Sequence, residues 1–144
     1  MSRFQGEKST QWFFWTLLKE RDIGLTDASI VYVVHLLDRF TRSDHAYAGT
    51  EKGRPTVFEY LERVEEADLV EQVSLYQHIG DLSLFLTSLF ERSLLASKSY
   101  YIGVGSNAYI HVAAKVKEAT RAIVFEELSD RFEDVVNSIS KIRE

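Results

Sequence analysis

The chain has 144 residues, 45 % of them hydrophobic, which is enough to bury one core and too apolar for a disordered chain. Its 22 acidic and 17 basic residues give a net charge of −5, and the basic residues are scattered, so nucleic acid is not an expected partner. Because cysteine is absent, disulfides, thiolate metal sites and cysteine nucleophiles are excluded. We expect one domain over residues 1–144.

Membrane insertion and secretion have no support in the sequence. No apolar run approaches the ~20 residues that cross a bilayer, and the first ten residues lack the apolar core of a signal peptide. We therefore expect a cytoplasmic protein with no membrane partner.

The scarcity of residues that break helices favours an all-helical chain. Pro55 is the single proline and turn dipeptides are scarce, which is typical of long helices joined by short connections. The first helix should begin at Ser9 or Thr10 and end at the break at Gly24. A second should begin after Thr26, with apolar residues on one face.

Two further helices follow the proline. Thr56 and Glu59 have the spacing of a capping box, which predicts a helix that ends near Ala67. Asp68 can cap a fourth helix that runs to about Glu91. This helix has apolar residues on most of its circumference, so we expect it to be the central element of the bundle.

The remaining segments complete an all-α, compact single-domain bundle of five to six helices. Ser97 or Ser99 should open the fifth helix, and an apolar stripe predicts a last helix over about residues 122–142. Residues 41–55, with two glycines and a proline, are the one candidate irregular segment. We interpret them as a mobile loop rather than a functional one, because they contain no catalytic constellation.

Small residues on the fourth and fifth helices predict a tight helix pair. A glycine inside a helix costs ~1 kcal/mol relative to alanine, so it needs a reason such as close packing. The two helices should form an αα-hairpin joined at residues 92–98 and cross where each has a strip of small side chains. The strips are Gly80, Ser83 and Thr87 on the fourth helix, and Gly103, Ser106, Ala113 and Ala114 on the fifth.

Asp81 is the most informative single residue, because it lies on a polar stripe within an apolar helix. One interpretation is structural: the stripe meets solvent, or Asp81 accepts hydrogen bonds from a neighbouring helix or caps one. The other is a buried carboxylate that binds a metal or activates a water with His78, one turn earlier. We favour the structural interpretation, since buried polar groups are usually hydrogen-bonded.

A ligand site in the bundle could also recruit His111 from the fifth helix, if the hairpin brings its face to His78 and Asp81. No Glu-x-x-His motif of the di-iron type, phosphate-binding loop or serine-nucleophile motif is present. We therefore expect no metal and no cofactor. The sequence identifies no catalytic residue and weighs against an enzyme.

The aromatic residues suggest a contact surface. Residues 12–15 are consecutive aromatics, which project around the whole helix and cannot all face one core. Exposed aromatic side chains are common anchors in protein interfaces. The alternative is that the first helix packs between two others and buries all four. The interface candidates are Trp12, Trp15, Tyr100, Tyr101 and Tyr109.

The stretch HIGDLSLFLTSLF followed by YYIGVGSNAY, within residues 76–109, resembles an uncharacterised bacterial all-helical family. The shared pattern is Leu/Ile-Gly-Asp, Leu-Phe-Leu and Tyr-Tyr-x-x-Gly…Tyr. Sequences of that family often carry a proline after Leu-Phe, whereas Glu91 and Arg92 follow Phe90 here. The resemblance implies a bacterial, helical, cytosolic protein, and it implies no activity.

Two function classes remain. The first is a non-enzymatic, self-associating interaction or regulatory module, most simply a homodimer with a possible protein partner. The alternative is a helical bundle that binds a metal or small ligand near His78 and Asp81, with an enzymatic or sensing role.

Overall fold

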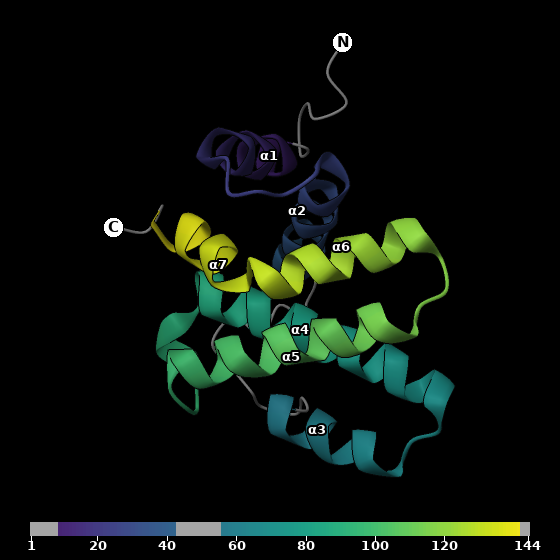
Figure 1. The fold of residues 1–144 in the computed structure, drawn as a ribbon. Coiled ribbons are helices and arrows are strands. Elements are labelled where there is room, and N and C mark those ends of the chain that lie inside the picture. Colours follow the sequence, from purple (N-terminus) through teal and green to yellow (C-terminus); the bar gives the residue numbers. More distant parts are fainter. Residues whose placement is uncertain (1–8, 43–55, 142–144) are drawn as a thin grey trace.

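The computed structural model describes residues 9–42 and 56–141, which form a bundle of α-helices without a strand in these two ranges (Figure 1). The predicted all-α class is therefore confirmed. A short 3₁₀ turn, η2 (Glu91–Ser93), follows the fourth helix. The seven α-helices of the described ranges are α1 (Ser9–Arg21), α2 (Asp27–Arg42), α3 (Val57–Glu66), α4 (Leu69–Leu89), α5 (Lys98–Lys115), α6 (Ala119–Asp130) and α7 (Phe132–Ser140).

Three helices begin at the residues whose side chains were expected to cap them. The Thr56 hydroxyl accepts from the Glu59 amide at 3.2 Å, and the Glu59 carboxylate accepts from the Thr56 amide at 3.0 Å, a complete capping box. Asp68 accepts from the Glu71 amide, and Ser97 caps α5 in the same way.

The expected number of helices is too low because the segment over residues 122–142 is two helices. The break lies at Arg131, whose backbone leaves the helical region at φ −106° and ψ 17°. Its guanidinium contacts Asp130 at 3.5 Å and Asp134 at 3.9 Å across the break. The bend lets α6 run along α5 while α7 turns to pack on α4 and α1.

Helix α4 is the centre of the bundle. Every residue from Ile79 to Ser88 is buried, and α4 packs against α2, α3, α5 and α7. Helices α1 and α3 lie at opposite ends of the molecule, with α1 packed on α2 and α7 (Figure 1). None of the helices in the described ranges is both long and apolar enough to cross a lipid bilayer. Residues 43–55, most of the expected mobile loop, lie outside the described part of the chain.

Two glycines of the α4 and α5 hairpin leave space for aromatic rings, one from α5 and one from α7. A Cβ added at Gly80 would lie 2.5 Å from the Tyr109 ring, and one at Gly105 would collide with the Phe132 ring. The expected contact between two small-residue strips is therefore wrong for Gly103, which is exposed with no atom near its missing Cβ. The reason is angular: residues 103 and 105 point to different sides of a helix, and residue 105 is the inward one.

The other members of the two strips divide between the core and the surface. Ser83 and Thr87 are buried in α4, and Ala113 is buried in α5, whereas Ala114 is exposed. Ser106 faces α6 instead of α4, because its hydroxyl donates to the Ser129 carbonyl at 2.6 Å.

The two glycines make a matched pair of tests. Gly80→Ala should destabilise the fold by ~1–3 kcal/mol, because the new methyl group overlaps a buried ring. Gly103→Ala should stabilise it by up to ~1 kcal/mol, because open space surrounds that helical position. Urea unfolding of both variants measures the two effects. Equal changes of the same sign would contradict the packing described here.

Candidate functional site

Asp81 on α4 is the centre of a buried polar cluster. Its side chain is only 3 % exposed. One carboxylate oxygen, Oδ1, accepts hydrogen bonds from the Tyr32 hydroxyl of α2 and the Tyr109 hydroxyl of α5, both at 2.7 Å. The other oxygen, Oδ2, lies 3.3 Å from a guanidinium nitrogen of Arg39, also on α2. The carboxylate therefore joins three helices.

A second set of contacts extends the cluster to α6. Gln77, one turn before Asp81 on α4, donates from its amide nitrogen to the Tyr32 hydroxyl oxygen at 2.9 Å. Its amide oxygen accepts from Arg121 at 2.9 Å. Each amide and hydroxyl named in this chain of contacts has a protein partner, and the chain ends at the exposed Arg121 on the surface.

Aromatic rings pack against the two tyrosines that bind the carboxylate. The centre of the Tyr109 ring lies 5.5 Å from that of Phe125 and 5.8 Å from that of Phe132. Tyr32 meets Phe125 edge to face at 5.2 Å. These rings shield the hydrogen bonds to Asp81 from water, which strengthens them and raises the cost of losing one.

Burial raises the pKa of the Asp81 carboxyl from its ordinary value of 3.8 to about 6. Hydrogen bonds from Tyr109 and Tyr32 and the charge of Arg39 act in the opposite direction and limit the rise. Burial, followed by the Asp81 charge, raises the pKa of both tyrosines. At neutral pH the cluster therefore holds a carboxylate between two protonated tyrosines.

His78 points to a different part of the core. Its ring packs edge to face on Tyr60 of α3 at 4.5 Å and lies 6.2 Å from Phe40 of α2. Burial, followed by the charges of Arg39 and Arg63, lowers the pKa of this imidazole, so it is neutral at pH 7. Its Nε2 is buried without a hydrogen-bond partner.

The hypothetical site of His78, Asp81 and His111 is not assembled. The His111 ring stacks on Tyr76 at 4.3 Å, and burial followed by the Lys115 charge lowers its pKa. Across residues 9–42 and 56–141, no group of three or more histidine or acidic side chains is placed to hold a metal. The physical reason is that each of the three side chains packs against different neighbours.

The aromatic interface candidates separate into two groups. Trp12 is 51 % exposed and Tyr100 is 42 % exposed, although Tyr100 also stacks on Phe58. Trp15 is half-buried. The remaining two candidates, Tyr101 and Tyr109, are core residues and not interface residues, because their rings are buried at 2 % and 0 % exposure.

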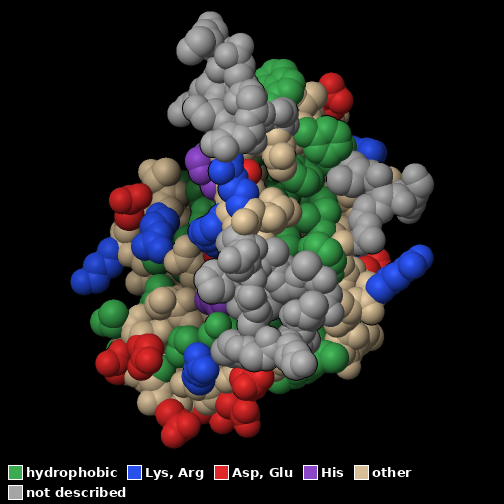
Figure 2. Space-filling view, turned by 180° about the vertical axis from the view of Figure 1, so that it is seen from behind, with side chains coloured by type: hydrophobic (Ala, Val, Ile, Leu, Met, Phe, Trp, Pro, Cys, Tyr) green, Lys and Arg blue, Asp and Glu red, His purple; other side chains and the backbone are tan. Residues whose placement is uncertain are grey.

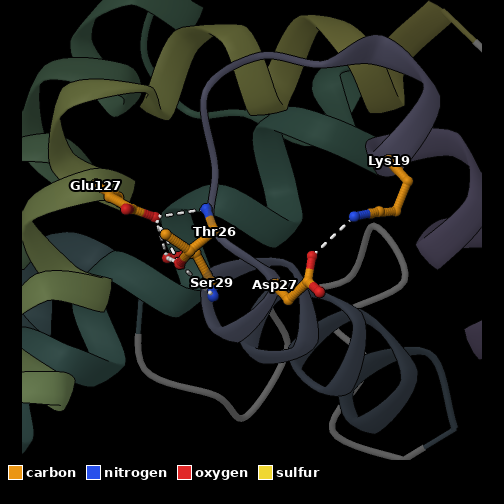
Figure 3. Close-up of polar contacts among 5 residues, drawn as sticks. All are labelled: Lys19, Thr26, Asp27, Ser29 and Glu127. Carbon is orange, nitrogen blue, oxygen red and sulfur yellow. Dashed lines mark hydrogen bonds and ion pairs between the residues drawn. The ribbon is translucent and has the colours of Figure 1, made fainter.

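A second polar cluster fastens α6 to the start of α2 (Figure 3). One oxygen of Glu127 accepts from the Thr26 amide at 2.9 Å, the Thr26 hydroxyl at 3.0 Å and the Ser29 hydroxyl at 2.6 Å. Burial would raise the pKa of Glu127, but the hydrogen bonds from Ser29 and Thr26 hold it below its usual value. A carboxylate at a helix N-terminus also interacts favourably with the helix dipole. Lys19 pairs with Asp27 beside it at 2.8 Å.

Sequence reasoning missed the donors to Asp81. Tyr32 and Arg39 are seven residues apart, so they share a face of α2, and that spacing was an available signal. The long Arg39 side chain reaches Asp81 while remaining 61 % exposed. The contact between Arg121 and Gln77 could not be predicted from the sequence, because the two residues lie 44 positions apart.

The protein's own side chains occupy the carboxylate of Asp81. Both of its oxygens already contact protein donors, so a ligand would have to displace a tyrosine or Arg39. Comparison of the chain with protein-family models, curated proteins and solved structures finds no match. These comparisons therefore do not extend the resemblance of residues 76–109 to a helical family.

The pKa of Asp81 predicts a pH dependence of stability. In the folded chain the carboxyl binds its proton more tightly than in the unfolded chain, so its contribution to stability falls as the pH rises from about 4 to about 6. Replacing Asp81 with Asn removes the titration of this carboxyl group. The effects of all other carboxylates are the same in both proteins, so they cancel when the two stabilities are subtracted. The stability of wild type minus that of Asp81→Asn should thus fall by up to ~3 kcal/mol over this window and level off above it.

Urea unfolding of both proteins at several pH values measures the difference. A difference that stays constant, or increases between pH 4 and 6, would contradict the raised pKa.

Proposed function

We propose that this chain is a cytosolic, non-enzymatic interaction module that self-associates through the outer face of α1. The supporting observation is that Trp12 and Phe13, adjacent on this helix, are 51 % and 48 % exposed. Large exposed apolar side chains that lie together are typical of contact surfaces. Tryptophan is also the residue type most enriched among interface residues that dominate binding energy.

Only some of the apolar side chains of α1 are buried on the face that packs against the bundle. Phe14 and Leu18 are buried at 5 % and 1 % exposure, and they fasten the helix to the bundle. Trp12 and Phe13 remain on the other side of the helix, at the end of the molecule where Figure 2 shows hydrophobic side chains on the surface. A helix with apolar side chains on both faces buries the second face when another surface covers it.

A second copy of the chain is the simplest partner. A symmetric dimer uses the same patch on both subunits, so one exposed aromatic pair supplies both halves of the contact. Aromatic side chains also provide a large contact area for a small loss of rotamer entropy. The alternative, a metal or small ligand near His78 and Asp81, has weaker support, because Asp81 is already hydrogen-bonded within the protein.

Replacing the exposed pair tests the proposal. Trp12→Ala combined with Phe13→Ala should weaken self-association by tenfold or more, because each large anchor residue typically contributes above ~1 kcal/mol. Light scattering after size exclusion, over a range of protein concentrations, measures the change. The control is Leu69→Ala combined with Val70→Ala, which removes side chains that are 70 % and 84 % exposed on α4.

The control should associate as wild type does, and circular dichroism should show unchanged helicity in both variants. A monomeric wild-type chain, or equal dimerisation of all three proteins, would reject α1 as a self-association surface.

A further inference from the structure

A polar cleft lies where three helix ends meet. It has a volume of about 410 Å³ and is formed by the end of α4, the 3₁₀ turn η2, the start of α5 and the end of α7. These helix ends lie on the same side of the molecule, at the left of Figure 1. The lining residues that the structure describes are all polar or charged: Ser88, Glu91, Arg92, Lys98, Asn137, Ser140 and Lys141.

The charge of the cleft is opposite to that of the chain. Among the described lining residues, Arg92, Lys98 and Lys141 face a single carboxylate, Glu91, which leaves a formal balance of +2 in a protein of net charge −5. Lys98 is held by Glu91 at 3.1 Å. Arg92 and Lys141 form no ion pair with any residue in the described ranges. Two cationic side chains are therefore available to an anion.

Helix ends alone do not explain these cations. Arg92 and Lys141 follow the C-terminal ends of α4 and α7, where a positive charge complements the helix dipole. Lys98 is different, because it is the first residue of α5 and lies at the positive end of that helix. Its position is unfavourable unless an anion is close, and Glu91 offsets only one of the three cations.

Neutral groups in the cleft have the chemistry of oxyanion recognition. The Ser88 side chain is 1 % exposed, and its hydroxyl has no hydrogen-bond partner. Asn137 supplies an amide on the opposite wall. The Ser140 hydroxyl contacts the Thr87 and Ser88 carbonyls at 3.4 and 3.3 Å, which joins the α7 wall to the α4 wall.

We propose that this cleft binds a small phosphate-bearing anion through Arg92 and Lys141, with Asn137 and Ser88 as neutral donors. The planar guanidinium of Arg92 can meet two phosphate oxygens at once, and Lys141 adds a point charge. A phosphomonoester is a dianion near neutral pH, which matches the formal balance of the lining side chains. The lining residues in the described part of the chain are all polar or charged, which argues against a lipid tail or an apolar peptide as the occupant.

Titration of the full chain with inorganic phosphate, followed by amide NMR spectra at constant ionic strength, tests the proposal. Phosphate should shift the resonances of Ser88, Arg92 and Asn137 saturably, and chloride should not. Arg92→Gln combined with Lys141→Gln should weaken phosphate binding by about tenfold or more, because two charge-assisted contacts are lost. The matched control, Arg21→Gln combined with Lys117→Gln, removes the same charge from exposed positions outside the cleft and should bind as wild type does.

A third variant makes the charge of the cleft more positive instead of less positive. Glu91→Gln removes the one carboxylate among the described lining residues and frees Lys98, so phosphate should bind more tightly. Shifts that grow linearly, that chloride reproduces, or that persist equally in Arg92→Gln with Lys141→Gln would overturn the proposal. Its failure would leave the proposed self-association intact, because the cleft shares no residue with the exposed face of α1.

Discussion

The hydrogen bonds from Tyr32 and Tyr109 to the buried Asp81 carboxylate constrain the rest of the structure most strongly. Moving a carboxylate out of water costs several kcal/mol, and well-placed donors to its oxygens offset part of that cost. Those donors come from α2 and α5, so a shift of either helix along α4 would take a hydrogen-bond donor away from the buried carboxylate. The cluster therefore sets the positions of three helices.

Gly80 and Asp81 together form the binding position of the Tyr109 side chain on α4. The missing Cβ of Gly80 leaves room for the tyrosine ring, and the next residue, Asp81, accepts a hydrogen bond from its hydroxyl. The close approach and the hydrogen bond depend on each other, because a side chain at position 80 would push the ring away from the carboxylate. The Gly-Asp pair is thus a single structural unit.

The bend at Arg131 connects this core to the two surfaces for which we propose functions. It directs α7 away from α5 and across α4, which places Asn137 and Lys141 opposite Arg92. It also brings α7 against α1, so the inner face of α1 has a surface to pack on while Trp12 stays exposed. The anion cleft and the aromatic face are therefore separate consequences of one change in chain direction.

Local chemistry in the sequence predicts the helix starts, whereas contacts between distant residues remain hidden. Thr56, Asp68 and Ser97 are readable as caps because each partner lies three residues away. The break at Arg131 is not readable, since neither proline nor glycine marks it. Gly103 and Gly105 look alike in the sequence, and the direction of α5 relative to α4 decides which of them is packed.

The same limit applies to the candidate sites. The sequence identifies Asp81 as a polar residue in an apolar helix, but its donors lie 28 and 49 residues away and appear only when the helices assemble. The cleft combines residues from α4 to the end of α7, and none of them forms a sequence motif. The exposure of Trp12 beside the buried Phe14 likewise depends on which face of α1 meets the bundle.

A double-mutant cycle between Asp81→Ala and Tyr109→Phe tests the central role of the carboxylate most directly. Unfolding free energies of wild type, both single variants and the double variant isolate the interaction between the two side chains. A hydrogen bond to a buried charge predicts a coupling energy of ~1.5–3 kcal/mol. Changes in stability that add to within ~0.5 kcal/mol would contradict the account, because they would show that α4 and α5 are positioned without this contact.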